Sequence, residues 1–195
     1  MKLNEVLNTV LETIPEDALI ISIFGQISEK LYEIRDLDSI FYMRGGMGLA
    51  SSVGLGVSLS VPERRVVILD GDGSATMNMN TFATISNAHP KNLVHIIVDN
   101  QVHGSIGGYP SFTSNGLDFS AVAKACGINS ASKTSEVKGL RKCLAIAFSE
   151  EGPHVIVATV EFEKSAGVGH AVRLVHIKER FMKAVREDNP NLADL

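Results

Sequence analysis

The sequence predicts an α/β protein with a doubly wound, mostly parallel sheet and helices on both faces. Three observations predict it: short apolar runs recur along the chain, stretches with helical spacing separate them, and glycine turns follow several of the runs. Near-continuous apolar runs are typical of parallel strands that helices cover on both faces. Ligands bind such sheets at the carboxyl ends of the strands, so the glycine turns mark the edge where a site is expected.

The expected strands and helices alternate along the whole chain. Strands are expected at 18–24, 39–43, 66–69, 93–98, 128–131 and 154–160, and helices at 3–14, 29–35, 49–60, 75–88, 119–126 and 135–148. Ser28 is expected to cap the second helix, and Thr134 or Ser135 the last of these. A glycine-rich loop is expected at 104–116. The tail, residues 172–195, is expected to hold an amphipathic helix over 172–187.

The helix expected at 49–60 is unusually rich in small residues, including Gly54 and Gly56. Each glycine costs a helix about 1 kcal/mol relative to alanine. We therefore expect this helix to pack closely against a strand or a ligand, which would offset the cost of its glycines.

Length and composition predict one domain over residues 1–195, since no linker, repeat or low-complexity segment divides the chain. The net charge of −4 gives no indication of nucleic-acid binding. The start of the chain lacks the features of a signal peptide, and no apolar run reaches the roughly 20 residues of a membrane span. Cys126 and Cys143 are interpreted as buried thiols, which favours a cytoplasmic location.

The chemistry centres on two strand ends. Gly71-Asp72-Gly73 follows one apolar run, and Asn100 follows the next. A carboxylate and a carboxamide offer hard oxygens suited to Mg²⁺ or Ca²⁺, and glycines let the backbone approach an anion. The alternative is structural: Asp72 caps the following helix and Asn100 fills a turn.

The spacing of these residues resembles the thiamine-diphosphate motif, in which Gly-Asp-Gly is followed a few tens of residues later by Asn. Gly25-Gln26 looks like the diphosphate-contacting turn of the acetolactate-synthase group, and Gly45-Gly46-Met47-Gly48 resembles its Gly-Ala-Met-Gly segment. The whole chain is similar to the diphosphate-binding (PP) domain of that superfamily.

A narrower resemblance covers Met77 to Gly108 and continues from Asp118 to Gly127. These segments are similar to the phosphonopyruvate and sulfopyruvate decarboxylases. The length favours a split enzyme, in which this chain is the beta subunit and a lone PP domain. The resemblance implies decarboxylation of a small 2-oxoacid, first 3-sulfopyruvate, as in coenzyme M synthesis or sulfonate metabolism, with phosphonopyruvate or another split carboligase as the alternative.

The resemblance also implies a role for each matching residue. Mg²⁺ would be held by the side chains of Asp72 and Asn100 and by the carbonyl of Val102. Thiamine diphosphate would be contacted by Gly25, Gln26, Ile27, Gly45, Met47, Gly71, Gly73, Ser74, His103, Gly104 and Ser105. Asp99 departs from the second Asn of many relatives and adds negative charge near the metal.

No catalytic residue is assigned to this chain. The glutamate that activates the cofactor's aminopyrimidine would come from a pyrimidine-binding (PYR) domain on a partner alpha subunit, so the chain alone is expected to be inactive. Met47 would prop the bent cofactor, the alternative being a core methionine. Arg44 would read a sulfonate or phosphonate, or else form an ion pair.

Two other classes are considered. An oxoacid:ferredoxin oxidoreductase beta subunit usually carries several cysteines for an iron–sulfur cluster, whereas this chain has two. A non-enzymatic cofactor-binding scaffold is the other, and the intact Asp72, Asn100 and Met47 argue against it.

Overall fold

The computed structural model describes residues 1–164 and 172–186. The strands of the main sheet are β1 (Leu19–Ser22), β2 (Ile40–Tyr42), β3 (Val66–Gly71), β4 (Leu93–Asp99), β7 (Ala131–Thr134) and β8 (His154–Thr159). The α-helices are α1 (Leu3–Thr13), α2 (Gln26–Ile34), α3 (Ala50–Ser60), α4 (Asp72–Met77), α5 (Thr81–Ala88), α6 (Phe119–Ala125), α7 (Val137–Ser149) and α8 (Leu174–Arg186). Between β4 and α6 lie the short strands β5 (Val102–His103) and β6 (Tyr109–Pro110) and the 3₁₀ turns η1 (Gly104–Ile106) and η2 (Phe112–Asn115).

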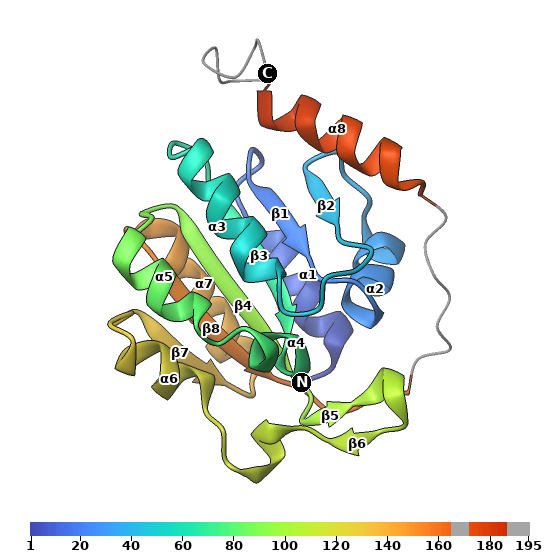
Figure 1. Cartoon of the computed structure of the whole chain (residues 1–195), viewed down its shortest axis with the longest axis vertical. Coiled ribbons are helices and arrows are strands. Elements are labelled where there is room, and N and C mark those ends of the chain that lie inside the picture. The colour runs from blue at the N-terminus through green and yellow to red at the C-terminus, as the bar shows by residue number, and fades with distance from the viewer. Residues whose placement is uncertain (165–171, 187–195) are drawn as a thin grey trace.

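The main sheet has six strands in the order β2-β1-β3-β4-β8-β7, and every neighbouring pair is parallel. Helices α1, α2 and α7 cover one face, and α3, α5 and α6 cover the other (Figure 1). The predicted fold class is therefore confirmed. Helix α8 packs beside β2, where Arg180 forms a two-pronged ion pair with Asp36 at 2.7 Å.

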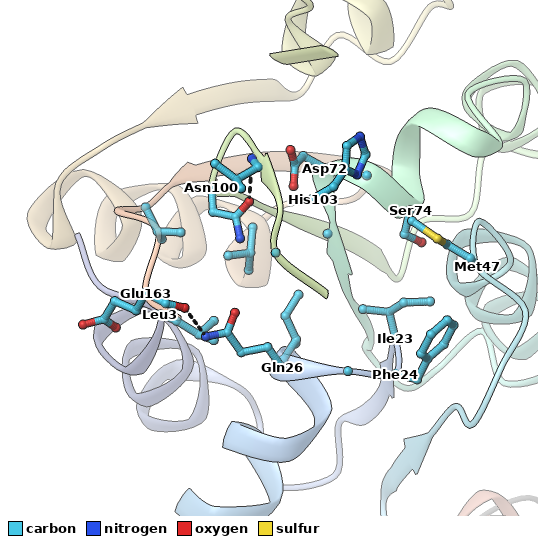
Figure 2. Close-up of a pocket in the computed structure, with 18 of the residues that line it drawn as sticks. Leu3, Ile23, Phe24, Gln26, Met47, Asp72, Ser74, Asn100, His103 and Glu163 are labelled. Atoms are coloured by element: carbon cyan, nitrogen blue, oxygen red, sulfur yellow. Dashed lines mark hydrogen bonds between the residues drawn. The ribbon is translucent and has the colours of Figure 1, made fainter. Parts of the chain in front are cut away.

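The strand order reverses direction between β1 and β3. The chain passes from β1 outward to β2, returns to β3 on the other side of β1, and then continues to β4. In open parallel sheets this switch point opens a crevice at the carboxyl ends of the strands, and ligands bind there. Figure 2 shows side chains from these strand ends gathered around one cavity.

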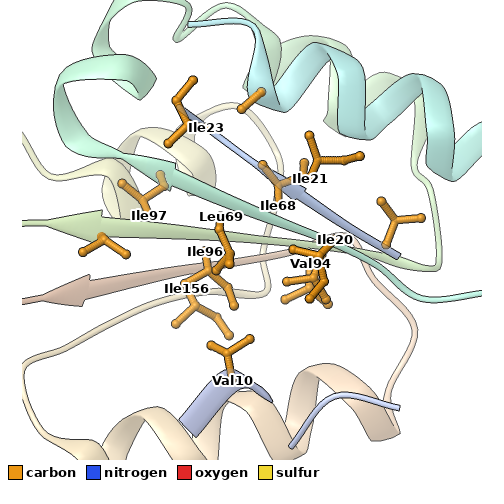
Figure 3. Close-up of a cluster of buried hydrophobic side chains, with 14 of the residues drawn as sticks. Val10, Ile20, Ile21, Ile23, Ile68, Leu69, Val94, Ile96, Ile97 and Ile156 are labelled. Carbon is orange, nitrogen blue, oxygen red and sulfur yellow. The ribbon is translucent and has the colours of Figure 1, made fainter. Parts of the chain in front are cut away.

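The core consists of aliphatic side chains on both faces of the central strands (Figure 3). Ile20, Ile68 and Ile96 are fully buried, and Val10 of α1 packs from below the sheet. Such apolar burial contributes about 25 cal/mol per Å² of surface removed from water. The sheet is thus a rigid platform that fixes where each strand ends.

Several element boundaries differ from the sequence prediction. Helix α2 begins at Gln26 rather than after Ser28, because Gly25 adopts φ +88° and lets the helix start directly after the turn. The helix expected over 75–88 is broken at Asn78, whose side chain donates to the carbonyl of Gly48 at 2.8 Å.

Two predictions toward the C-terminus also need correction. The strand expected at 128–131 is wrong: Ile128 fills the core from a turn, and β7 runs over Ala131–Thr134 instead. The N-cap of α7 is Glu136, and Thr134 Oγ1 accepts a bond from its backbone N–H. Helix α8 confirms the helix in the tail up to Arg186, and residues 187–195 lie outside the described residues.

Candidate functional site

A cavity of about 230 Å³ lies at the switch point and gathers most of the predicted site residues. Those that line it are Gly25, Gln26, Ile27, Met47, Gly71, Asp72, Gly73, Ser74, Asn100, Val102, His103 and Gly104. They come from the segments after β1, β2, β3 and β4, so the sheet brings together four turns far apart in sequence. Gly45, exposed in the turn after β2, is not among the lining residues, and Ser105 follows Gly104 in η1.

The turn after β1 forms one wall of the cavity. Gly25 is the N-cap of α2, and the first helical residue, Gln26, donates from Nε2 to the carbonyl of Glu163 at 2.9 Å (Figure 2). Ile27 is buried behind it. The unpaired backbone N–H groups at the start of α2 favour an anion such as a diphosphate.

Asp72 is the first residue of α4 and is buried, with 4% of its surface exposed. Its Oδ2 accepts bonds from the hydroxyls of Ser111 and of Thr113, the latter at 3.2 Å. Burial raises the pKa of the Asp72 carboxyl above its usual range, and the nearby charge of Asp99 acts in the same direction, while the Ser111 hydroxyl opposes it. A cation placed beside such a buried carboxyl would stabilise its ionised form and oppose the rise in its pKa.

Asn100 directly follows β4, and its Oδ1 accepts a bond from the backbone N–H of Val102 at 2.9 Å (Figure 2). This local turn points the chain from β4 into the β5–β6 hairpin, in which Val102 pairs with Pro110. Asn100 therefore holds the shape of the loop that faces Asp72.

His103, Gly73 and Met47 pack against one another along another wall. A Cβ placed on Gly73 would lie 2.8 Å from His103 Nδ1 and 3.4 Å from Met47 Cε, so only glycine allows this approach. Met47 has 41% of its surface exposed, which contradicts the alternative that it is a core residue. Ser74 Oγ accepts a bond from Gly48 N at 3.0 Å and ties α4 to the Met47 turn.

Ser111 and Thr113 were missed by the sequence analysis. Both are buried, and both contact the Asp72 carboxylate from η2 and the residue before it. Isolated hydroxyls in a loop carry no pattern of their own, and only the fold brings them back to Asp72. The cavity also includes Leu3 of α1 and Glu161 and Glu163 after β8, which no motif indicated.

The residues present fit a divalent cation with a bound diphosphate. Two buried carboxylates, Asp72 and Asp99, share the hydroxyls of Ser111 and Thr113; Asp99 Oδ1 also accepts from the Gln101 N–H, and Asp99 Oδ2 has no hydrogen-bond partner among the described residues. Such an excess of oxygen acceptors favours a hard cation. Within the described residues no three His, Cys, Asp or Glu side chains gather as a metal centre, so amide, carbonyl and phosphate oxygens would have to complete the set.

The comparisons with known proteins agree with this geometry. The family "Thiamine pyrophosphate enzyme, C-terminal TPP binding domain" matches residues 25–158. The chain belongs to this family of thiamine-diphosphate enzymes, which confirms the resemblance seen in the sequence.

Particular relatives fall into two groups. The chain is 35% identical to the sulfopyruvate decarboxylase subunit beta of Methanocaldococcus jannaschii, over 93% of this chain and 96% of the relative. It is 38% identical to the same subunit of Methanococcus maripaludis, over 94% and 97%. It is 40% identical to the phosphonopyruvate decarboxylase of Streptomyces viridochromogenes, over 84% of this chain but only 41% of that protein.

The solved structures show the same fold. The thiamine diphosphate-dependent 4-hydroxybenzoylformate decarboxylase of Rhodococcus jostii RHA1 matches with a TM-score of 0.75 at 21% identity, over 85% of this chain and 33% of that one.

Across residues 1–164 and 172–186, none of the helices has the length and apolarity needed to cross a membrane.

Proposed function

We propose that this chain is the beta subunit of a thiamine-diphosphate- and Mg²⁺-dependent decarboxylase that converts 3-sulfopyruvate to sulfoacetaldehyde and CO₂. The observation that carries the proposal is the match in length: sulfopyruvate decarboxylase beta subunits align with this chain over nearly all of both sequences. The cavity at the switch point supplies the chemistry that such a subunit needs.

In this proposal the cavity holds the diphosphate end of the cofactor. Asp72, Asn100 and the carbonyl of Val102 would bind Mg²⁺, which suits their hard oxygens. The remaining contacts are assigned as the sequence predicts, with Gly25, Gln26, Ile27, Gly71, Gly73, Ser74, His103, Gly104 and Ser105 toward the diphosphate and Gly45 and Met47 toward the aminopyrimidine. When bound, the cofactor supplies an electron sink for the electrons of the departing carboxylate.

This chain's own residues orient and shield the cofactor. Met47 offers an apolar surface next to the backbone of Gly73, where it can support a ring above the diphosphate. Ile23 and Val98 line the cavity between the strands and exclude water from its floor. A dry floor strengthens the attraction between the Asp72 carboxylate and a cation.

The proposal includes a partner alpha subunit with a PYR domain that supplies the activating glutamate. The cavity, at about 230 Å³, is smaller than the roughly 300–1,000 Å³ of sites that enclose a whole drug-sized ligand. Large apolar side chains remain exposed near it, including Phe24, Met47 and Phe162. A second wall over this rim would bury them and complete the site.

Phosphonopyruvate is the second candidate substrate, favoured by the 40% identity to a phosphonopyruvate decarboxylase. It is placed second because the chain spans about two-fifths of that protein. Cys126 and Cys143 are half-buried, not fully buried as the sequence predicts; both are free thiols, which agrees with the cytoplasmic location that we propose.

The decisive assay measures CO₂ release from 3-sulfopyruvate and from phosphonopyruvate, using this chain with a co-expressed PYR-domain chain from the neighbouring gene. We expect activity only when both chains, thiamine diphosphate and Mg²⁺ are present, and a preference for 3-sulfopyruvate. Full activity of this chain alone would overturn the proposal, and a preference for phosphonopyruvate would transfer it to the second candidate.

A binding test addresses the metal assignment directly. This chain carries all the proposed Mg²⁺ ligands, so we expect calorimetry to detect Mg²⁺-dependent binding of thiamine diphosphate to the purified chain. Asp72→Ala should abolish it, whereas Asp17→Ala, which removes an exposed carboxylate, should not change it. Unchanged binding by the folded Asp72→Ala variant would refute the assignment.

A further inference from the structure

Residues 160–163, which follow β8, form a strap along one side of the cavity. The strap begins on the sheet, where the backbone N–H of Val160 donates to the carbonyl of Asp99 at 2.9 Å. The backbone N–H of Glu161 donates to the carbonyl of Met1 at 2.8 Å. Three of the four strap residues line the cavity. Backbone bonds thus fix the first half of the strap, and its second half contacts two other turns.

The far end of the strap holds the turn after β1. The backbone carbonyl of Glu163 accepts a hydrogen bond from Gln26 Nε2 at 2.9 Å (Figure 2). A glutamine amide nitrogen carries two N–H groups, so this bond leaves one of them for a ligand in the cavity. The carboxylate of Glu163 pairs with Lys2 at 3.1 Å, but both side chains are exposed, and such ion pairs contribute little. The backbone carbonyl is therefore the contact that joins the strap to Gln26.

Phe162 joins the strap to the η1 turn on the other side. A Cβ placed on Gly104 would lie 2.7 Å from Phe162 Cε2 and 3.5 Å from Cζ, so the ring lies directly against the backbone of Gly104. Phe162 has 39% of its surface exposed and does not belong to the buried core. The ring therefore supports η1 rather than the interior of the fold.

The strap connects two turns that the proposed function places at the diphosphate. One is the start of α2, where Gln26 is the first helical residue, and the other is η1, which begins at Gly104. A diphosphate needs donors from both turns at a fixed separation. Donors that supporting contacts already hold in place bind more tightly than donors that must first be ordered. A segment that contacts both turns can fix their separation.

We propose that Phe162 is a positioning residue for thiamine diphosphate, acting through the strap that holds the turn after β1 and the η1 turn together. Phe162 does not itself line the cavity, so it would act on the cofactor through the backbone of Gly104. This role rests on the proposed function, because it assumes that the cavity holds the diphosphate end of the cofactor.

Calorimetry of thiamine diphosphate binding to the purified full chain, with Mg²⁺ present, tests this role. Phe162→Ala should weaken binding about 5–10-fold, a usual size for residues coupled through a shared contact. The Tm of the ligand-free chain should change by no more than about 2 °C, as for other side chains outside the core. Phe162→Leu keeps an apolar side chain against Gly104 and should recover most of the affinity. Ile146→Ala is the matched control: Ile146 is 40% exposed, lies on α7 and does not line the cavity, so binding should not change.

Gly104→Ala separates an effect on the ring from an effect on the ligand. The added Cβ leaves the backbone N–H in place but displaces the Phe162 ring, as an approach of 2.7 Å requires. In the wild-type chain we expect the same loss of about 5–10-fold. In the Phe162→Ala chain no ring remains to be displaced, so Gly104→Ala should cause no further loss. An equal loss in both backgrounds would show that the Cβ meets the ligand directly, and would overturn the proposed role.

A second double variant tests the link between the two turns. Gln26→Leu removes the amide that bonds to the strap. When combined with Phe162→Ala, its effect should fall short of the product of the two separate losses by at least about twofold, because breaking either contact already frees the turns. Losses that multiply would show that the two residues act independently, which contradicts a strap that couples them.

The remaining results are also decisive. Unchanged binding by Phe162→Ala, or an equal loss in Ile146→Ala, would overturn the proposed role. If circular dichroism shows that Phe162→Ala does not fold, Phe162→Leu replaces it as the second background, and Gly104→Ala should then cost less than in the wild-type chain because leucine fills less space. Failure of the wild-type chain to bind thiamine diphosphate, alone or with its co-expressed partner, would instead overturn the proposed function, and this role with it.

Discussion

Helix α3 offers a sharp test of how closely it packs on β3, the strand that leads to Asp72. A Cβ placed on Gly54 would lie 2.3 Å from Cγ1 and 2.5 Å from Cδ1 of Ile68. Ile68 is fully buried and lies in the middle of the sheet beneath α3 (Figure 3). Strand β3 is paired on both sides, with Ile21 of β1 and His95 of β4 opposite Ile68, so the strand cannot move away.

The expected cost of Gly54→Ala follows from two opposing effects. Alanine gains about 1 kcal/mol over glycine within a helix. Overpacking a core usually costs about 1–3 kcal/mol, and a contact as short as 2.3 Å falls at the upper end. The net loss of unfolding free energy is therefore about 2 kcal/mol, or about 4–8 °C in Tm for a chain of this length.

Gly56, two residues further along the same helix, is the matched control. It is exposed, and no atom lies within 4 Å of a Cβ built there. Gly56→Ala should therefore raise Tm by about 2–4 °C, since only the helix-propensity gain of about 1 kcal/mol remains. Thermal unfolding followed by circular dichroism measures both variants. If Gly54→Ala is as stable as Gly56→Ala, the close approach of α3 to β3 is refuted.

Three further predictions concern the cavity and the edges of the sheet. Gly73→Ala should weaken binding of thiamine diphosphate at least about tenfold by forcing the His103 ring, whose Nδ1 lies 2.8 Å from the added Cβ, to shift. Because His103 is itself a proposed contact, the reference is the His103→Ala chain: there the added Gly73→Ala should weaken binding less, and an equal loss in both backgrounds would contradict this reason. Asn92→Ala should lower the unfolding free energy in urea by about 2–3 kcal/mol, because the two amide protons on the buried Asn92 Nδ2 are shared among three backbone carbonyls; a loss below about 0.5 kcal/mol would contradict the expected cost of leaving these carbonyls unpaired. Burial lowers the pKa of His154 below the usual 6.5, so the folded state favours the neutral ring. The unfolding free energy that this neutral ring preserves is fully present above pH 6.5 and is lost as the pH falls through and below that value, because the unfolded chain then binds the proton more readily. Replacing His154 by Gln should flatten the fall of Tm between neutral pH and about pH 5, and an unchanged pH profile would contradict this assignment.

The sequence was sufficient to predict which strand ends carry the candidate site residues, because this prediction depends on local signals. Apolar runs mark β1, β3 and β4, and parallel strands must bring their carboxyl ends to one edge. The sequence alone could therefore place Asp72 and Asn100 at the same edge of the sheet. The glycine at position 54 also indicated close packing, and its contact with Ile68 is the physical reason for it.

What the sequence could not predict depends on contacts between distant segments. Thr113 reaches Asp99 and Asp72 only because the β5–β6 hairpin folds the loop back across the ends of β3 and β4. Strand β7 was misplaced because it lies at the edge of the sheet and exposes Lys133, while the more apolar Ile128 beside it serves the core from a turn. The spacing of apolar residues indicates which residues are buried. Here the large buried residue is Ile128, whereas the residues that pair in the sheet are those of β7.

The distribution of exposed apolar surface explains why the site is open on one side. The central strands are buried throughout, yet Phe24, Met47 and Phe162, which border the cavity or touch its lining, each leave more than a third of their surface exposed. Exposed apolar patches on a folded chain mark surfaces that bind a ligand or another protein. A cofactor bound at Asp72 would cover Met47 but would not reach the whole rim, so the remaining exposure agrees with the proposed PYR-domain partner. In the proposed function the chain would thus supply a rigid, acidic anchor for one end of the cofactor and an apolar rim on which the second subunit would close over the other end.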